Sequence, residues 1–183
     1  MNYNYIKNYL IKRKAIIIIT IIFVLFMIIV LPLINWLNIN YIGEMASPDT
    51  MLFYSAEKFY LLMDNYGSSG RNLYIILRWT FDFIYPLVYG VFLLSWLLFL
   101  MDKLNKIYKW MIYLVMFAVT MDYLENIFAS INVGIYPKEI PLLVYIMQVS
   151  SFLKWLSLIF IIINILVLSF IFIKKSKFSK NIN

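Results

Sequence analysis

The sequence predicts an all-α integral membrane protein, a bundle of four transmembrane helices in a single domain, residues 1–183. First, 64% of the 183 residues are hydrophobic and the mean hydropathy is +0.85, whereas a soluble domain is nearer half apolar. Second, four apolar stretches are long enough to cross a hydrocarbon core of about 30 Å. Third, most Lys and Arg residues border these stretches, as in membrane proteins of fixed orientation.

The first expected span, 15–37, is almost entirely Ile, Val, Leu and Phe. Basic residues precede it, so a signal peptide is the competing interpretation. The apolar run is longer than a signal peptide needs, and no small-residue cleavage site closes it, which favours an uncleaved span. Pro32 is expected to kink its far end.

The longest polar connection, 38–72, is expected to hold a turn at residues 47–50 and a short amphipathic helix at 56–66. Ser55 is a typical N-cap for that helix, and Gly67 is a typical terminator. Two interpretations stay open: a packed loop helix, or a lid over a cavity.

The other three spans are expected at 73–101, 110–133 and 142–173, with turns at 67–70, 102–109 and 136–141. Pro86 lies inside the second span, where a proline usually kinks a helix. Gly90 permits close approach of a neighbouring helix.

The charge distribution predicts the orientation. The N-terminal arm, the loop at 102–109 and the C-terminal tail are rich in Lys and Arg, which predicts that both termini are cytoplasmic. The amphipathic helix then lies in the first outer loop of a multi-pass cell-membrane protein. The net charge of +7 is explained by this pattern, so no nucleic-acid partner is expected.

Cysteine and histidine are both absent from the sequence. A disulfide, a thiol nucleophile, a Cys/His zinc site and a Ser-His-Asp triad are therefore excluded. Acid–base chemistry would depend on Asp, Glu, Lys or Tyr, and no cofactor is expected.

Ionisable side chains within the spans are the strongest functional signal. Because such groups are costly in a bilayer, they are expected to face the protein interior. Four of them share one helical face of the second span, at spacings of four, three and four. Helical rise puts the charged groups of three spans at a similar depth, about eight to twelve residues inward. The candidate ligand-binding residues are Arg78, Asp82, Tyr85, Tyr89, Asp122, Glu125, Asn126 and Lys154.

This set holds two cations and three carboxylates. The third carboxylate is expected to be protonated, hydrated or paired with a ligand cation, and Glu125 or Asp82 is the candidate acid or base. Two structural alternatives remain: a buried network that only fixes helix register, and an Arg78 that extends outward to the interface. The acidic spacing matches no metal motif, so no metal is predicted.

Several strings carry a resemblance: TFDFIYPLVYG at 80–90 and DYLEN at 122–126, with PDTMLFYSAEKFY at 48–60 and GRNLY at 70–74. Together they resemble an uncharacterised family of bacterial four-span membrane proteins. The resemblance implies fold and membrane location but no activity. A weaker architectural likeness is to emopamil-binding, sterol-isomerase-like four-span proteins. The chain departs from their typical isomerase site because it has no histidine.

We therefore expect a membrane protein that binds a small hydrophobic or amphiphilic, lipid-like ligand in a polar intramembrane pocket. The alternatives are a membrane enzyme with carboxylate acid–base residues, a proton-coupled small carrier, or a structural accessory subunit. The expected partners are the lipid bilayer, such a ligand and a second copy of the chain. Whether the chain catalyses a reaction stays open.

Overall fold

The computed structural model describes residues 9–42, 48, 51 and 53–180, and within these ranges the regular structure is entirely helical. Four helical runs are long and apolar enough to cross a membrane, as the hydropathy predicts. The expected turn at 47–50 lies mostly outside the described residues. The elements in order are α2 (Arg13–Leu25), η1 (Phe26–Val30), α3 (Leu31–Ile42), α4 (Ala56–Leu104), α5 (Lys109–Gly134) and α6 (Pro141–Lys180).

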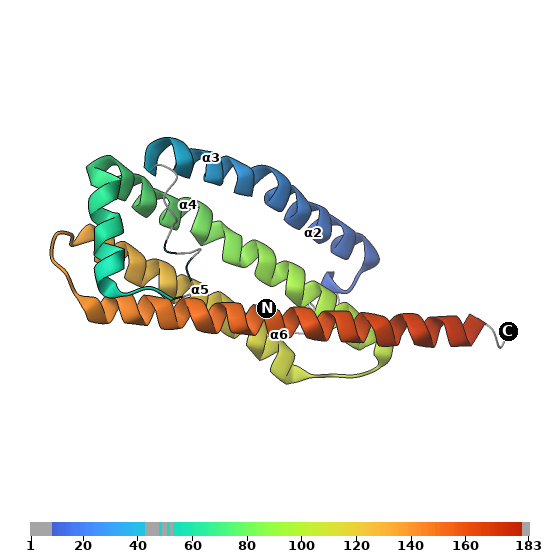
Figure 1. The fold of residues 1–183 in the computed structure, drawn as a ribbon. Coiled ribbons are helices and arrows are strands. Elements are labelled where there is room, and N and C mark those ends of the chain that lie inside the picture. The colour runs from blue at the N-terminus through green and yellow to red at the C-terminus, as the bar shows by residue number, and fades with distance from the viewer. Residues whose placement is uncertain (1–8, 43–47, 49–50, 52, 181–183) are drawn as a thin grey trace.

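The long helices run side by side, with α2, η1 and α3 along one flank of α4 (Figure 1). α4, α5 and α6 contact one another extensively, whereas the first span packs mainly on α4. Most of the large side chains that α2 exposes are apolar, including Ile17, Ile18 and Ile21. The core is therefore built by α4, α5 and α6, and the first span is peripheral.

The first span contains a π-helical turn, η1, rather than a simple proline kink. Pro32 lies two residues beyond this turn. Proline has no N–H to donate to the carbonyl four residues earlier, and its ring crowds that carbonyl. A wider turn just before the proline relieves this crowding without ending the helix.

α4 is one helical run with a single break. Its N-cap is Ser55, whose Oγ accepts a hydrogen bond from the Lys58 N–H at 3.1 Å. Gly67 leaves the helical region with φ 62° and ψ −176°, a conformation that glycine adopts because it has no Cβ. The helix resumes at the next residue, so the turn expected at 67–70 is reduced to one residue. The segment before Gly67 lies across the end of the bundle (Figure 1).

Side chains on either side of Gly67 fix this bend. Arg71 Nη1 donates to the Met63 carbonyl at 2.7 Å, and its guanidinium lies 4.5 Å from the centre of the Tyr136 ring. Tyr136 in turn donates to Asp64 Oδ1 at 3.0 Å. The segment before Gly67 is therefore attached both to the rest of α4 and to the connection between α5 and α6.

Two apolar clusters fill the core. One lies near the α5–α6 connection, around Phe59 and Met147, and the other lies toward the α4–α5 connection, around Leu97 and Ile161. Along each of α4, α5 and α6, the buried ionisable side chains fall between these clusters in the sequence. The bundle is thus apolar on its surface and polar at its centre.

α5 lies close against α4 at Gly90, which confirms the predicted role of this glycine. A Cβ added there would lie 2.8 Å from Val119 Cγ2. We expect Gly90→Ala to lower stability by about 1–3 kcal/mol, because Val119 is stiff and the overlap outweighs the helix propensity of alanine.

The measurement is thermal unfolding of the purified protein in detergent. Val119→Ala in the same chain should restore most of the loss. Gly134→Ala is the matched control, because an added Cβ there meets no atom within 4 Å. Equal effects of the two glycine substitutions would contradict the close contact.

Candidate functional site

Arg78 faces the protein interior rather than the interface. Its side chain is 4% exposed, and Nη1 donates to Asn126 Oδ1 at 2.8 Å and pairs with Asp82 Oδ2 at 3.2 Å. Nη2 donates to the Tyr74 hydroxyl at 2.6 Å, and the guanidinium lies 4.5 Å from the centre of the same ring. The outward-extending alternative is therefore wrong, because α5 supplies the partner that holds the guanidinium inside.

Lys154 of α6 joins two carboxylates of α5. Its Nζ lies 2.6 Å from Glu125 Oε2 and 3.4 Å from Asp122 Oδ1, and all three residues are buried. Asp122 Oδ2 also accepts a hydrogen bond from the Tyr89 hydroxyl of α4 at 2.9 Å. Charged groups of α5 and α6 therefore meet a hydroxyl of α4 at one level, and the charged pair of α4 contacts Asn126 of α5 instead.

The contacts around Arg78 and those around Lys154 are linked through α5. Asn126 follows Glu125 directly, and its Nδ2 donates to the Asp82 carbonyl at 3.1 Å. We call the combined set the polar centre: Tyr74, Arg78, Asp82, Tyr89, Asp122, Glu125, Asn126 and Lys154. With every group ionised, two cations face three carboxylates, and two of those carboxylates share Lys154.

Tyr85, the remaining candidate, is placed differently. Its hydroxyl contacts Met27 Sδ at 3.7 Å, and its ring lies 5.6 Å from that of Phe26, centre to centre. The ring also meets Tyr89 edge-on at 5.2 Å. The first span packs on α4 at this level and takes up the hydroxyl, so Tyr85 borders the polar centre without bonding to its charges.

Sequence reasoning missed three buried polar residues. Tyr74 precedes Arg78 by four residues, so the same helical spacing could have identified it. Asn132 lies seven residues after Glu125 on the same face of α5, and its Oδ1 accepts from the Tyr60 hydroxyl at 2.8 Å. The Tyr60 hydroxyl also accepts from the Ile140 N–H at 2.6 Å. No local signal connects Tyr60 with residues some 70 or 80 positions away.

A groove runs along the membrane-facing surface of α4 and α5, beside the polar centre. It consists of two adjoining hollows, of about 360 and 290 Å³, which share Leu87 and Tyr123. Arg78 and Asn126 form part of its wall at one end. Its other lining residues are mostly apolar, including Trp79, Phe83, Ile127, Pro86, Gly90, Val91, Leu94, Val115, Met116 and Val119.

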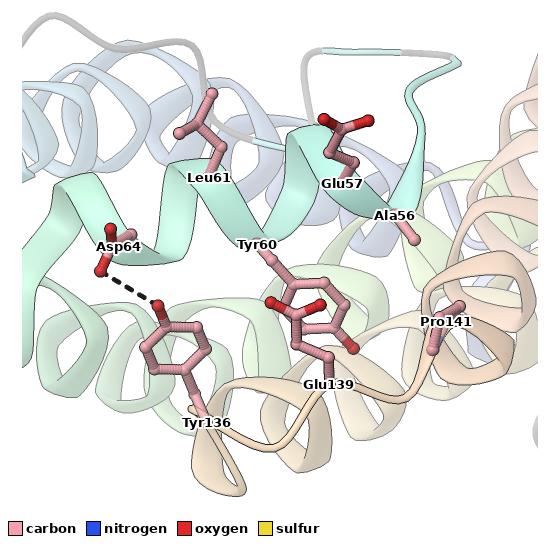
Figure 2. Close-up of a pocket in the computed structure, with 8 residues that line it drawn as sticks. All are labelled: Ala56, Glu57, Tyr60, Leu61, Asp64, Tyr136, Glu139 and Pro141. Carbon is pink, nitrogen blue, oxygen red and sulfur yellow. Dashed lines mark hydrogen bonds between the residues drawn. The ribbon is translucent and has the colours of Figure 1, made fainter.

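A second pocket, of about 460 Å³, opens where the bent start of α4 meets the α5–α6 connection (Figure 2). Its wall includes the rings of Tyr60 and Tyr136 and the carboxylates of Glu57, Asp64 and Glu139. Burial, together with the hydrogen bond to Asp64, raises the pKa of Tyr136. The hydroxyl therefore stays protonated at neutral pH and keeps donating to that carboxylate.

Within the ranges that the structure covers, no three Asp or Glu residues are arranged to hold a metal ion. Comparisons of the chain with protein-family models, with curated proteins and with solved structures give no match.

The polar centre predicts an uneven response to charge removal. Lys154→Met leaves two buried carboxylates without their shared cation, so we expect a loss of about 3–5 kcal/mol. Glu125→Gln should cost less, because Lys154 keeps Asp122. Combining the two substitutions should recover part of the loss caused by Lys154→Met.

Thermal unfolding in detergent checks this order. Lys174→Met, which removes an exposed lysine from the same helix, is the control and should change little. A Lys154→Met variant as stable as the parent protein would show that the buried pair does not hold α5 and α6 together.

Proposed function

We propose that this chain is a multi-pass protein of the cell membrane that binds a small lipid-like amphiphile. The observation that carries the proposal is the groove between α4 and α5, an apolar surface channel that ends at buried polar side chains. Small-molecule sites are typically concave and apolar, with a few polar groups that fix orientation, and they measure about 300–1,000 Å³. The two hollows have this size and composition.

The length of the groove suits one extended hydrocarbon chain. Along α4 it is lined from Trp79 to Leu94, a rise of about 22 Å at 1.5 Å per residue. This is a large part of a hydrocarbon core of about 30 Å. Gly90, where α4 and α5 lie close together, and Pro86 both line the groove, so the groove follows the line of contact between these two helices.

The polar end of the groove determines how an amphiphile would be oriented. Arg78 and Asn126 lie at that end, next to the rest of the polar centre. The carboxylates of Asp122 and Glu125 already contact Lys154, which disfavours the expectation that they meet a ligand cation directly. The head group would instead lie against the Arg78 end, with its chain along Phe83 and Leu87.

The same proposal includes the orientation expected from the basic residues. Both termini and the α4–α5 connection would face the cytoplasm, and the segment at 56–66 would lie at the outer surface. The groove would then open to the bilayer with its polar end in the outer half.

Filling the groove tests ligand binding without touching a charge. Ile127→Trp enlarges a half-exposed side chain of the groove wall. We expect it to lower labelling by a photoactivatable fatty acid about tenfold, which corresponds to about 1.4 kcal/mol of binding free energy.

Labelling is quantified by intact-protein mass spectrometry, and the labelled peptide should come from α4 or α5. Ile163→Trp is the matched control, because Ile163 is exposed on α6 and does not line the groove. Equal labelling of the two variants, or labelling spread evenly over all helices, would refute the groove as a binding site.

The absence of cysteine makes the orientation directly testable. Single substitutions Ser68→Cys and Ser176→Cys place one thiol at each end of the bundle, both at exposed positions. In intact cells we expect a membrane-impermeant maleimide to label Ser68→Cys and to label Ser176→Cys only after lysis. The reverse pattern would overturn the proposed orientation while leaving the groove proposal intact.

A further inference from the structure

Basic side chains from three separate parts of the chain gather at one end of the bundle. The start of α2, the α4–α5 connection and the end of α6 all lie toward this end (Figure 1). Asp102 is the one acidic side chain among them in the part of the chain that the structure describes. The basic residues, all exposed, are Lys12, Arg13, Lys14, Lys103, Lys106, Lys109, Lys174, Lys175 and Lys177.

α6 carries its lysines beyond the rest of the bundle. It has 40 residues, so it is about 60 Å long, twice the thickness of a hydrocarbon core. Figure 1 shows its C-terminal turns extending past the α4–α5 connection. Lys174 and Lys175 directly follow the apolar part of α6, 142–173, so we expect them where this helix leaves the hydrocarbon core.

The last turns of α6 combine cations with exposed apolar side chains. Phe170, Ile171, Lys174 and Lys175 line a hollow of about 430 Å³. Phe170 is 69% exposed. Their spacing places the two lysines one turn beyond the two apolar residues on the same face. Read along the helix, this face is first apolar and then cationic.

The end of α6 is held against α4. The rings of Phe172 and Phe99 meet edge-on at 6.3 Å, and Lys103 Nζ lies 5.6 Å from the centre of the Phe99 ring. The contact keeps Lys103 on the same side of the molecule as the α6 lysines. All four residues that line the hollow belong to α6, so the hollow lies on one face of this helix, next to the contact that holds the end of α6 on α4.

We propose that this surface binds an anionic phospholipid, with the phosphate at Lys174 and Lys175 and an acyl chain on Phe170 and Ile171. The order apolar then cationic matches the order in which a lipid presents its chain and its phosphate. Lysines near a membrane attract anionic lipids, whereas a zwitterionic head group offers no net charge. This site is separate from the α4–α5 groove in position and in charge, so it does not rest on that proposal.

The test removes two charges at the proposed site and two elsewhere at the same end. The variants are Lys174→Gln with Lys175→Gln, and Lys12→Gln with Lys14→Gln, each in the full chain. Phosphatidylglycerol and phosphatidylcholine are titrated onto the detergent-purified protein, and binding is measured by native mass spectrometry. For phosphatidylglycerol we expect the α6 pair to weaken binding about 25-fold, from about fivefold per lysine, and the α2 pair to weaken it far less.

Two further arms identify the ligand. Phe170→Ser should weaken binding of phosphatidylglycerol while leaving both lysines in place. Inorganic phosphate at millimolar concentration should not displace the lipid, because it lacks an acyl chain.

Each other result overturns the proposal. Equal losses for the two lysine pairs would mean that only diffuse charge acts at this end. Equal affinity of the parent chain for the two lipids would show no anionic preference. Displacement by inorganic phosphate, or a Phe170→Ser variant that binds as the parent does, would assign the lysines to phosphate alone.

Discussion

The ion pair between Lys154 and Glu125 is the interaction on which the arrangement of the bundle depends. Water cannot solvate either group when it is buried between apolar helices, so each charge is stable only where its partner lies. Sliding α6 by one turn relative to α5 would move Lys154 about 5.4 Å along α5 and leave Glu125 without its cation. The pair therefore fixes the register of α5 and α6. Because Asp122 also accepts from Tyr89, the same constraint extends to α4.

Because the buried carboxylates already contact cations of the protein, the interior suits a different kind of ligand from a small cation. Glu125 and Asp122 contact Lys154, Asp82 pairs with Arg78, and none of the four hollows described above is lined by these carboxylates. The hollow that does reach the polar centre, at Arg78 and Asn126, is predominantly apolar. A chain-like ligand with a small polar end matches that surface better than a compact ion. In the proposed function, the polar centre would orient the ligand, and the same side chains join the helices.

Much of the fold follows from local properties of the sequence. Hydropathy locates the four long helices, the hydroxyl of Ser55 marks the start of α4, and the spacing of Arg78 and Asp82 predicts an inward face. The predictions that are wrong concern side chains whose partners lie on another helix. The sequence of α4 alone does not reveal that the first span contacts the Tyr85 hydroxyl. Likewise, the serines at 68 and 69 suggest a turn, but both continue the helix because Gly67 absorbs the whole change of direction. The contact of Tyr60 with Asn132 is equally invisible, since 72 positions separate them.

The break at Gly67 divides α4 into two helical segments, residues 56–66 and 68–104, joined at a single glycine. Rotation about one glycine leaves the hydrogen bonds within each segment largely intact, so residues 56–66 could change direction only as one unit. The resistance to such a change comes first from the buried side chains of this segment, such as Phe59 and Met63, which pack in the core. The hydrogen bonds of Arg71 to the Met63 carbonyl and of Tyr136 to Asp64 add to it. The segment before Gly67 is thus anchored by its buried face, and any change in its direction would uncover the core beneath it.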